Sequence, residues 1–203
     1  ILILGVVVYF YLYYIIPRYK EDIIIKYSYK QKADVNYQVM LIPNDLYEEK
    51  SLNEGNIYIT QLIDHINVAF NYNFEGSKPT DIKGDYEIVA ILEGYIVEKE
   101  ARKTLWKKIL PISAKANIEE NEGIVSINRK VPIRLSEYSD FVKKVNEFLK
   151  FSTNVRFSIQ MNVSLTADID GTLLEEKMFP AIEIPLNVSY FTITKYNTGE
   201  KLG

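Results

Sequence analysis

One short stretch of the 203-residue chain has residue types and spacing that could carry out phosphoryl transfer. In "ADIDGTLLEE", residues 167–176, Asp168 and Asp170 stand two positions apart and are followed by Gly171 and Thr172. A carboxylate can act as a nucleophile or as a general acid and base, and carboxylate oxygens are ligands that Mg²⁺ prefers. Asp168 and Asp170 are therefore the first candidate catalytic pair.

The stretch resembles the nucleophile motif of the haloacid-dehalogenase-like phosphatases, but its surroundings differ from that family. There the motif follows an apolar strand buried in a parallel sheet. Here the preceding strand alternates with polar residues from Gln160 to Thr166, and only 31 residues follow Thr172, without a Gly-Asp-x-x-x-Asp equivalent. We interpret Asp170-Gly171 as the turn of a β-hairpin, because Gly accepts positive φ between two alternating strands.

Other candidate sites receive a structural interpretation as well. A Ca²⁺ loop at Asp168 would need an acidic residue at its twelfth position, and Glu175 and Glu176 come too early. His65 lies beside Asp64 without a nucleophile motif, and Trp106 stands in an alternating strand that favours a core position over a ligand platform. The sequence thus predicts no catalytic, cofactor-binding or metal-binding residues and favours a protein that is not an enzyme.

The composition narrows the classes of partner. The chain has 24 Lys and Arg against 27 Asp and Glu, a net charge of −3, which argues against a nucleic-acid partner. There is no cysteine, so disulfides and thiolate metal sites are excluded, and a single histidine leaves little for a transition-metal site. The absence of cysteine fits either side of a membrane and does not fix the compartment.

An uncharged apolar segment opens the chain. Residues 1–16 would form a helix of about 24 Å, short of the roughly 30 Å of a bilayer core, and the missing initiator Met indicates a start cropped from a longer span. Pro17 would end this helix, after a group of tyrosines that suits a membrane interface. We expect a transmembrane helix over 1–17 that binds the lipid bilayer through 1–16, followed by a linker over 18–26. A signal peptide and a buried strand or core helix are the alternatives.

The rest of the chain alternates between apolar and polar residues. Such period-two stretches include "YSYKQKADVNYQVML", "INVAFNYNF" and "NVRFSIQMNVSLTA". Alternation gives each strand one dry and one wet face, as in antiparallel sheets. We predict a mainly β fold, an antiparallel β-sandwich of jelly-roll or immunoglobulin-like type over 27–196, with a tail over 197–203. Two linked β-domains divided near 113–123 are the alternative.

One segment has helical periodicity instead. In "SEYSDFVKKVNEFLKF" apolar residues recur at spacings of three and four, which predicts one amphipathic helix near 136–150 docked on a sheet. Ser136 is the expected N-cap, and Glu137 and Asp140 lie in the first turn, where the helix dipole favours them.

Several stretches together resemble an uncharacterised bacterial and archaeal family, domain of unknown function 5305. They span roughly residues 27–195 in order: "YQVMLIPNDLYEEKSL", "YITQLIDHINVAFNYNFEG", "IKGDYEIVAILEG", "LWKKILP", "VPIRLSEYSDF" and "IEIPLNVSYFTI". The resemblance implies a membrane-anchored protein with an extracytoplasmic β-rich body, often followed by a second membrane helix. It implies no activity and no catalytic residues.

From these observations we expect a non-enzymatic structural or interaction domain at the cell surface. It would lie in a single-pass or two-pass membrane protein, with the β body on the extracytoplasmic side. Its partner would be an unknown protein or a component of the cell wall. The alternatives are a carboxylate-based hydrolase and an accessory protein for secretion or for assembly of surface polymers.

Overall fold

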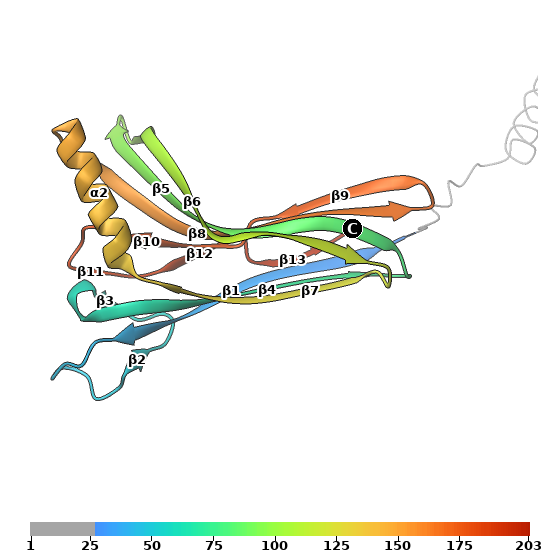
Figure 1. The fold of residues 1–203 in the computed structure, drawn as a ribbon, viewed down its shortest axis with the longest axis horizontal. Coiled ribbons are helices and arrows are strands. Elements are labelled where there is room, and N and C mark those ends of the chain that lie inside the picture. Colours follow the sequence, from blue (N-terminus) through green and yellow to red (C-terminus); the bar gives the residue numbers. More distant parts are fainter. Residues whose placement is uncertain (1–26) are drawn as a thin grey trace, which may run out of the picture.

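A computed structural model of the chain describes residues 27–203 (Figure 1). The predicted transmembrane helix over 1–17 and the linker over 18–26 lie outside the described residues. Among residues 27–203, none of the helices has the length and hydropathy of a transmembrane span. The described body is mainly β, with antiparallel sheets and one α-helix, as the sequence predicted.

Two antiparallel sheets make up the body. The β1 sheet has the strand order β13–β1–β4–β7, with β2 also paired to β1. Its strands are β1 (Tyr29–Leu41), β2 (Ser51–Leu52), β4 (Ile63–Gly76), β7 (Ile124–Ile133) and β13 (Gly199–Leu202). The β8 sheet has the order β12–β10–β8–β5–β6, with β9 also paired to β8. Its strands are β5 (Asp81–Glu98), β6 (Ala101–Glu120), β8 (Asn154–Ile169), β9 (Thr172–Met178), β10 (Ala181–Pro185) and β12 (Thr194–Tyr196).

Four further elements complete the described chain. They are β3 (Tyr58–Ile59), which pairs with β11 (Tyr190–Phe191), the 3-10 helix η1 (Thr60–Leu62), and the helix α2 (Leu135–Leu149). Figure 1 shows that α2, β3 and the β5–β6 turn lie at one end of the long axis, which we call the helix end. We call the opposite end, with the turns after β4, β6 and β8, the entry end.

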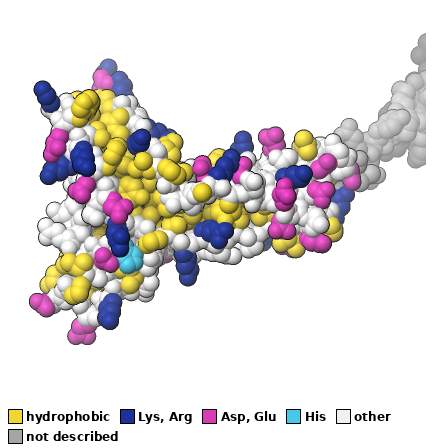
Figure 2. All heavy atoms as spheres, in the orientation of Figure 1, with side chains coloured by type: hydrophobic (Ala, Val, Ile, Leu, Met, Phe, Trp, Pro, Cys, Tyr) yellow, Lys and Arg dark blue, Asp and Glu magenta, His cyan; other side chains and the backbone are white. Residues whose placement is uncertain are grey.

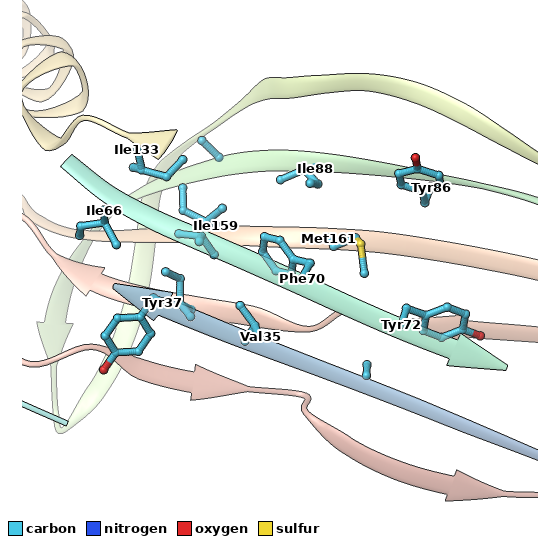
Figure 3. Close-up of a cluster of buried hydrophobic side chains, with 14 of the residues drawn as sticks. Val35, Tyr37, Ile66, Phe70, Tyr72, Tyr86, Ile88, Ile133, Ile159 and Met161 are labelled. Atoms are coloured by element: carbon cyan, nitrogen blue, oxygen red, sulfur yellow. The ribbon is translucent and has the colours of Figure 1, made fainter. Parts of the chain in front are cut away.

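One hydrophobic core lies between the two sheets. It takes Val35 of β1 and Phe70 of β4 from one sheet and Ile88 of β5 and Ile159 of β8 from the other, all fully buried (Figure 3). Burying an aliphatic or aromatic side chain of this size contributes about 1.5–3 kcal/mol. The alternation read from the sequence is the cause: in β8 every second residue from Val155 to Ala167 is buried and the residues between are not.

The helix begins one residue earlier than the sequence predicted. Its N-cap is Arg134, without a side-chain hydrogen bond, so the expected cap at Ser136 is wrong. Leu135, the first helical residue, is buried in the core, and Tyr138 packs against Phe157 with ring centroids 4.3 Å apart. The start of α2 is therefore set by tertiary packing and not by a capping side chain.

The chain enters and leaves the body at the same end. The backbone N–H of Tyr29 donates to the carbonyl of Gly203 at 2.9 Å, and the reverse bond measures 3.1 Å. The sequence predicted only a tail after residue 196, whereas Gly199–Leu202 pair with β1 from Lys30 to Ala33. Residues 113–123, the alternative domain boundary, lie in β6 and in the turn that follows it.

Candidate functional site

The Asp-x-Asp stretch forms the predicted hairpin. Asp170 and Gly171 are the two residues of the turn between β8 and β9, with φ of 53° and 83°, and Ile169 pairs with Thr172. The Asp168 carboxylate accepts a hydrogen bond from the Gly171 N–H at 2.9 Å. Positive φ at both central residues is the geometry that a two-residue hairpin favours. The Asp168 carboxylate thus closes a turn.

The other residues singled out from the sequence lie apart from one another. His65, on β4, contacts Asp64 through Nδ1 at 2.8 Å. Trp106, on β6, packs edge-on against Phe141 of α2 with ring centroids 6.4 Å apart. Within residues 27–203, no three His, Asp or Glu side chains are grouped closely enough to hold a metal ion.

Two carboxylates converge on an arginine on the outer face of the β8 sheet. Arg156 contacts Glu93 at 2.6 Å and Glu183 at 3.6 Å, and a shallow cavity of about 220 Å³ lies beside it. The Thr104 hydroxyl, with help from Arg156, holds the pKa of the Glu93 carboxyl below its usual value although burial opposes this. A glycosidase needs one carboxylic acid with a raised pKa. Glu93 is shifted in the opposite direction, so this cluster favours a role in binding the strands together.

The most buried carboxylate of residues 27–203 lies between the two sheets near the entry end. Glu176 of β9 accepts hydrogen bonds from Gln31 at 2.6 Å, from Lys201 at 2.6 and 2.9 Å, and from the Tyr29 hydroxyl. Burial alone would raise the pKa of Glu176, but these donors and the Lys201 charge outweigh it and lower the pKa. Burial and the bond to Glu176 raise the pKa of Tyr29 to about 12. The cluster links β1 and β13 to the other sheet.

A groove of about 650 Å³ follows the exposed side of α2 toward its C-terminal end. Asp140, Lys143 and Glu147 line it, together with the loop at Thr153. Both the backbone N–H and the hydroxyl of Thr153 bond to the Asn146 side chain at 3.4 Å. The groove carries both signs of charge and no converging set of titratable groups that would do chemistry.

A free sheet edge lies at the helix end of the body. In the β8 sheet β6 is the last strand: it pairs with β5 on one side and with no strand of the described chain on the other. Every residue from Ala101 to Ile109 is exposed except Trp106. An edge of this length leaves a row of backbone N–H and C=O groups open to a partner.

Apolar side chains gather beside this edge. Ile109 is 53 % exposed and Leu105 is 47 % exposed. On α2, Phe148 is 86 % exposed and lies about two helical turns beyond Phe141 on the same side of the helix. Figure 2 shows hydrophobic side chains gathered beside α2, over β5 and β6. We call the edge of β6 from Arg102 to Pro111, together with Phe141 and Phe148 of α2, the β6–α2 surface.

The charge along this edge has one sign. From Arg102 to Pro111 four of the ten residues are basic and none is acidic. Lys103 is paired with Glu98, whereas Lys107 and Lys108 appear in none of the ion pairs of residues 27–203. The β6–α2 surface therefore combines exposed apolar side chains with an excess of positive charge.

Sequence reasoning assigned Trp106 to a core position and did not identify the surface around it. The segment "RKTLWKKILP" does carry a detectable feature, a basic and apolar run without acidic residues. Whether such a strand lies inside a sheet or at its edge depends on distant strands: β8 pairs with β5, and no strand of the described chain pairs with the other side of β6.

A family model described as "Family of unknown function (DUF5305)" matches residues 106–203, which include most of the β6–α2 surface. Neither a curated protein nor a solved structure matches the chain. The stretches quoted above from residues before 106 lie outside the matched span. The resemblance to this family that was read from the sequence is thus confirmed over residues 106–203, just under half of the chain.

Proposed function

We propose that residues 27–203 form a non-enzymatic binding domain at the extracytoplasmic face of a membrane, held there by residues 1–16, and that the β6–α2 surface binds a protein partner. The observation that carries this proposal is the apolar, basic and unpaired edge at Leu105 to Ile109. Protein interfaces are built on such exposed apolar groups with a polar rim. The jelly-roll or immunoglobulin-like topology stays a prediction.

The position of this surface supports a role in reaching a partner away from the bilayer. The apolar segment precedes β1, whose first residue, Tyr29, lies at the entry end. In β5, Asp81 lies at the entry end and Gly94 pairs with Trp106 in the β6–α2 surface. Thirteen residues of strand separate them, so the surface stands roughly 40 Å from the entry end. A domain anchored at one end would present the other to its partner.

Membrane attachment and sidedness can be tested with one engineered thiol. Because the chain has no cysteine, Glu100→Cys in the β5–β6 turn would be its sole thiol. We expect a membrane-impermeant maleimide to label this variant in intact cells, and deletion of residues 1–16 to release the protein from the membrane fraction. Labelling that requires permeabilised cells would place the body in the cytoplasm and contradict the proposal.

Binding at the surface can be tested by photocrosslinking in cells that produce the full-length protein. A photoreactive residue at Ile109 should give a discrete adduct with another protein. The control is the same residue at Lys130, an exposed position of β7, the edge strand of the other sheet. Adducts of equal yield at both positions, or at neither, would remove the support for a specific protein-binding surface.

A further inference from the structure

The unpaired edge of β6 indicates how a partner would bind. We infer that the partner supplies an acidic, extended segment that adds to the β8 sheet as a new strand beside β6, between Arg102 and Pro111. This inference rests on the proposed function, because it specifies the chemistry of the partner at the same surface. Strand addition draws its affinity from backbone hydrogen bonds and its specificity from alternate side chains.

The backbone of β6 offers hydrogen-bonding groups in a regular pattern along this edge. The Ile88 N–H points toward β6, since it donates to the Ser113 hydroxyl at 3.0 Å. The backbone groups alternate along β5. The N–H and C=O groups of Ala90 and Leu92 therefore point toward β6, and those of Val89 and Ile91 point toward β8. It follows that Ile91 and its partner Ile109 are not hydrogen-bonded to each other.

The position of proline agrees with this pattern. Pro111 pairs with Val89, and proline is tolerated in an edge strand where its missing N–H would face away from the neighbouring strand. The register from Pro111 to Lys107 is continuous. The backbone N–H and C=O groups of Ile109 and Lys107 therefore also point away from β5. These two residues thus offer two N–H donors, with their carbonyls, to an incoming strand.

Side chains on the new strand would meet two different environments. One set would lie on the side of α2, near Trp106 and Phe141, which are in contact with each other. The other set would lie on the outer face of the sheet, near Lys107 and the half-exposed Ile109. A segment that places apolar and acidic residues on both faces suits these neighbours.

The charge of the edge selects among possible strands. With four basic residues and no acidic one from Arg102 to Pro111, an antiparallel pair of two copies of β6 would bring like charges together. Like charges opposite each other destabilise a strand pair, and lysines on an edge oppose self-association. An acidic strand would instead bring opposite charges together. The basic residues that oppose pairing with a second copy of β6 therefore favour an acidic partner.

A defined peptide tests the inference on the full-length protein in detergent. The probe is a ten-residue peptide in which two Glu residues alternate with two Val or Ile residues, so that each face of the strand carries both kinds, and its control has Lys in place of each Glu. Trp106 is the sole tryptophan of the chain and lies in the surface, so its fluorescence reports binding. We expect the Glu peptide to shift the emission, to lose affinity with added salt, and to slow hydrogen exchange at the amides of Lys107 and Ile109.

Two pairs of variants test strand addition and charge separately. Ile109→Pro removes one outward N–H and should weaken binding about tenfold, whereas Ile109→Val keeps it and should bind like the wild type. Lys107→Glu with Lys108→Glu should weaken binding of the Glu peptide by about tenfold or more, whereas Lys130→Glu on β7 should not. Circular dichroism of each variant checks that the fold is kept, and the charge variants remain informative if Ile109→Pro unfolds.

The outcomes separate this inference from the proposed function. Binding that shifts Trp106 emission but leaves exchange at Lys107 and Ile109 unchanged would overturn strand addition and leave a protein-binding surface. Equal binding of the Glu and Lys peptides would overturn the acidic partner. A concentration-dependent dimer that protects the same amides, or binding to anionic lipid vesicles in place of the peptide, would also overturn it. Failure of both the peptide and the Ile109 crosslink would remove the proposed function as well.

Discussion

The carboxylate of Glu176 lies 2.6 Å from the ammonium group of Lys201 and joins two sheets that share no strand pairing. Glu176 belongs to β9 of the β8 sheet, and Lys201 to β13, the last strand of the β1 sheet. The Glu176 side chain is 8 % exposed. A carboxylate this buried is stable only if its oxygens accept hydrogen bonds, and Gln31 and Tyr29 supply two more. The Glu176 carboxylate therefore holds β13 and β1 against the β8 sheet near the entry end.

Removing the charge at this position is expected to destabilise the body. Glu176→Gln keeps the shape but loses charge-assisted hydrogen bonds, so the free energy of unfolding should fall by about 1.5–3 kcal/mol at neutral pH. Urea unfolding measures this change. Glu175→Gln, at the exposed neighbouring residue, is the matched control and should change stability by less than about 0.5 kcal/mol. Equal effects of the two substitutions would contradict the role of the buried carboxylate.

The same group predicts how stability depends on pH. The folded-state pKa of Glu176 lies below its ordinary value of 4.5, so the folded protein releases this proton more readily than the unfolded chain. Its contribution is present above pH 4.5 and is lost as the pH falls through the lower folded-state pKa. Wild-type protein should lose stability over this acidic range more steeply than Glu176→Gln, by unfolding curves at matched pH. Parallel pH profiles would contradict the assignment.

Gly94 is expected to be required for the position of Trp106. A Cβ atom at residue 94 would lie 2.1 Å from Nε1 of the Trp106 ring that covers it. Gly94→Ala should therefore force the ring away, lower stability by about 1–3 kcal/mol and shift the tryptophan emission. In a Trp106→Leu background the same substitution should cost much less, which a double-mutant cycle measures. A cost that is unchanged in that background would show that the ring is not the cause.

The β5–β6 turn carries strain that can be relieved. Lys99 and Glu100 have φ of 49° and 65°, a conformation that side chains other than Gly and Asn adopt at a cost. Replacing them by Asn and Gly should raise the free energy of unfolding by about 1 kcal/mol. Lys99→Ala with Glu100→Ala removes the same charges but keeps the strained backbone, and should not stabilise. If the alanine pair stabilises equally, the gain comes from charge and not from the backbone.

Asp168 is expected to have no part in phosphate chemistry. Because its carboxylate accepts the Gly171 N–H in a hairpin turn, Asp168→Asn should leave aryl phosphate hydrolysis at background with or without Mg²⁺. Melting should likewise be the same with and without Ca²⁺. Mg²⁺-dependent hydrolysis that Asp168→Asn abolishes would reverse this interpretation.

The sequence was most informative where neighbouring residues alone decide which face of a strand a side chain occupies. Alternation over Val155 to Ala167 predicted the buried face of β8, and Asp170-Gly171 predicted its turn. The sequence did not predict elements whose formation or position depends on contacts with residues that are distant in the chain. The strand β13 has no apolar alternation; it pairs with β1, where Lys201 contacts the buried Glu176 and Glu200 contacts Lys30. The free edge of β6 likewise depends on which strands flank β5, a property that no local pattern contains.

The backbone bonds between Tyr29 and Gly203 have a consequence for engineering. Since these residues lie next to each other, a short linker could join them, and new termini could be opened at the β5–β6 turn. Such a circular permutant would keep both sheets, but its membrane tether would be attached at the helix end. Its β6 edge would then face the tether, so reach and recognition could be varied independently in one polypeptide.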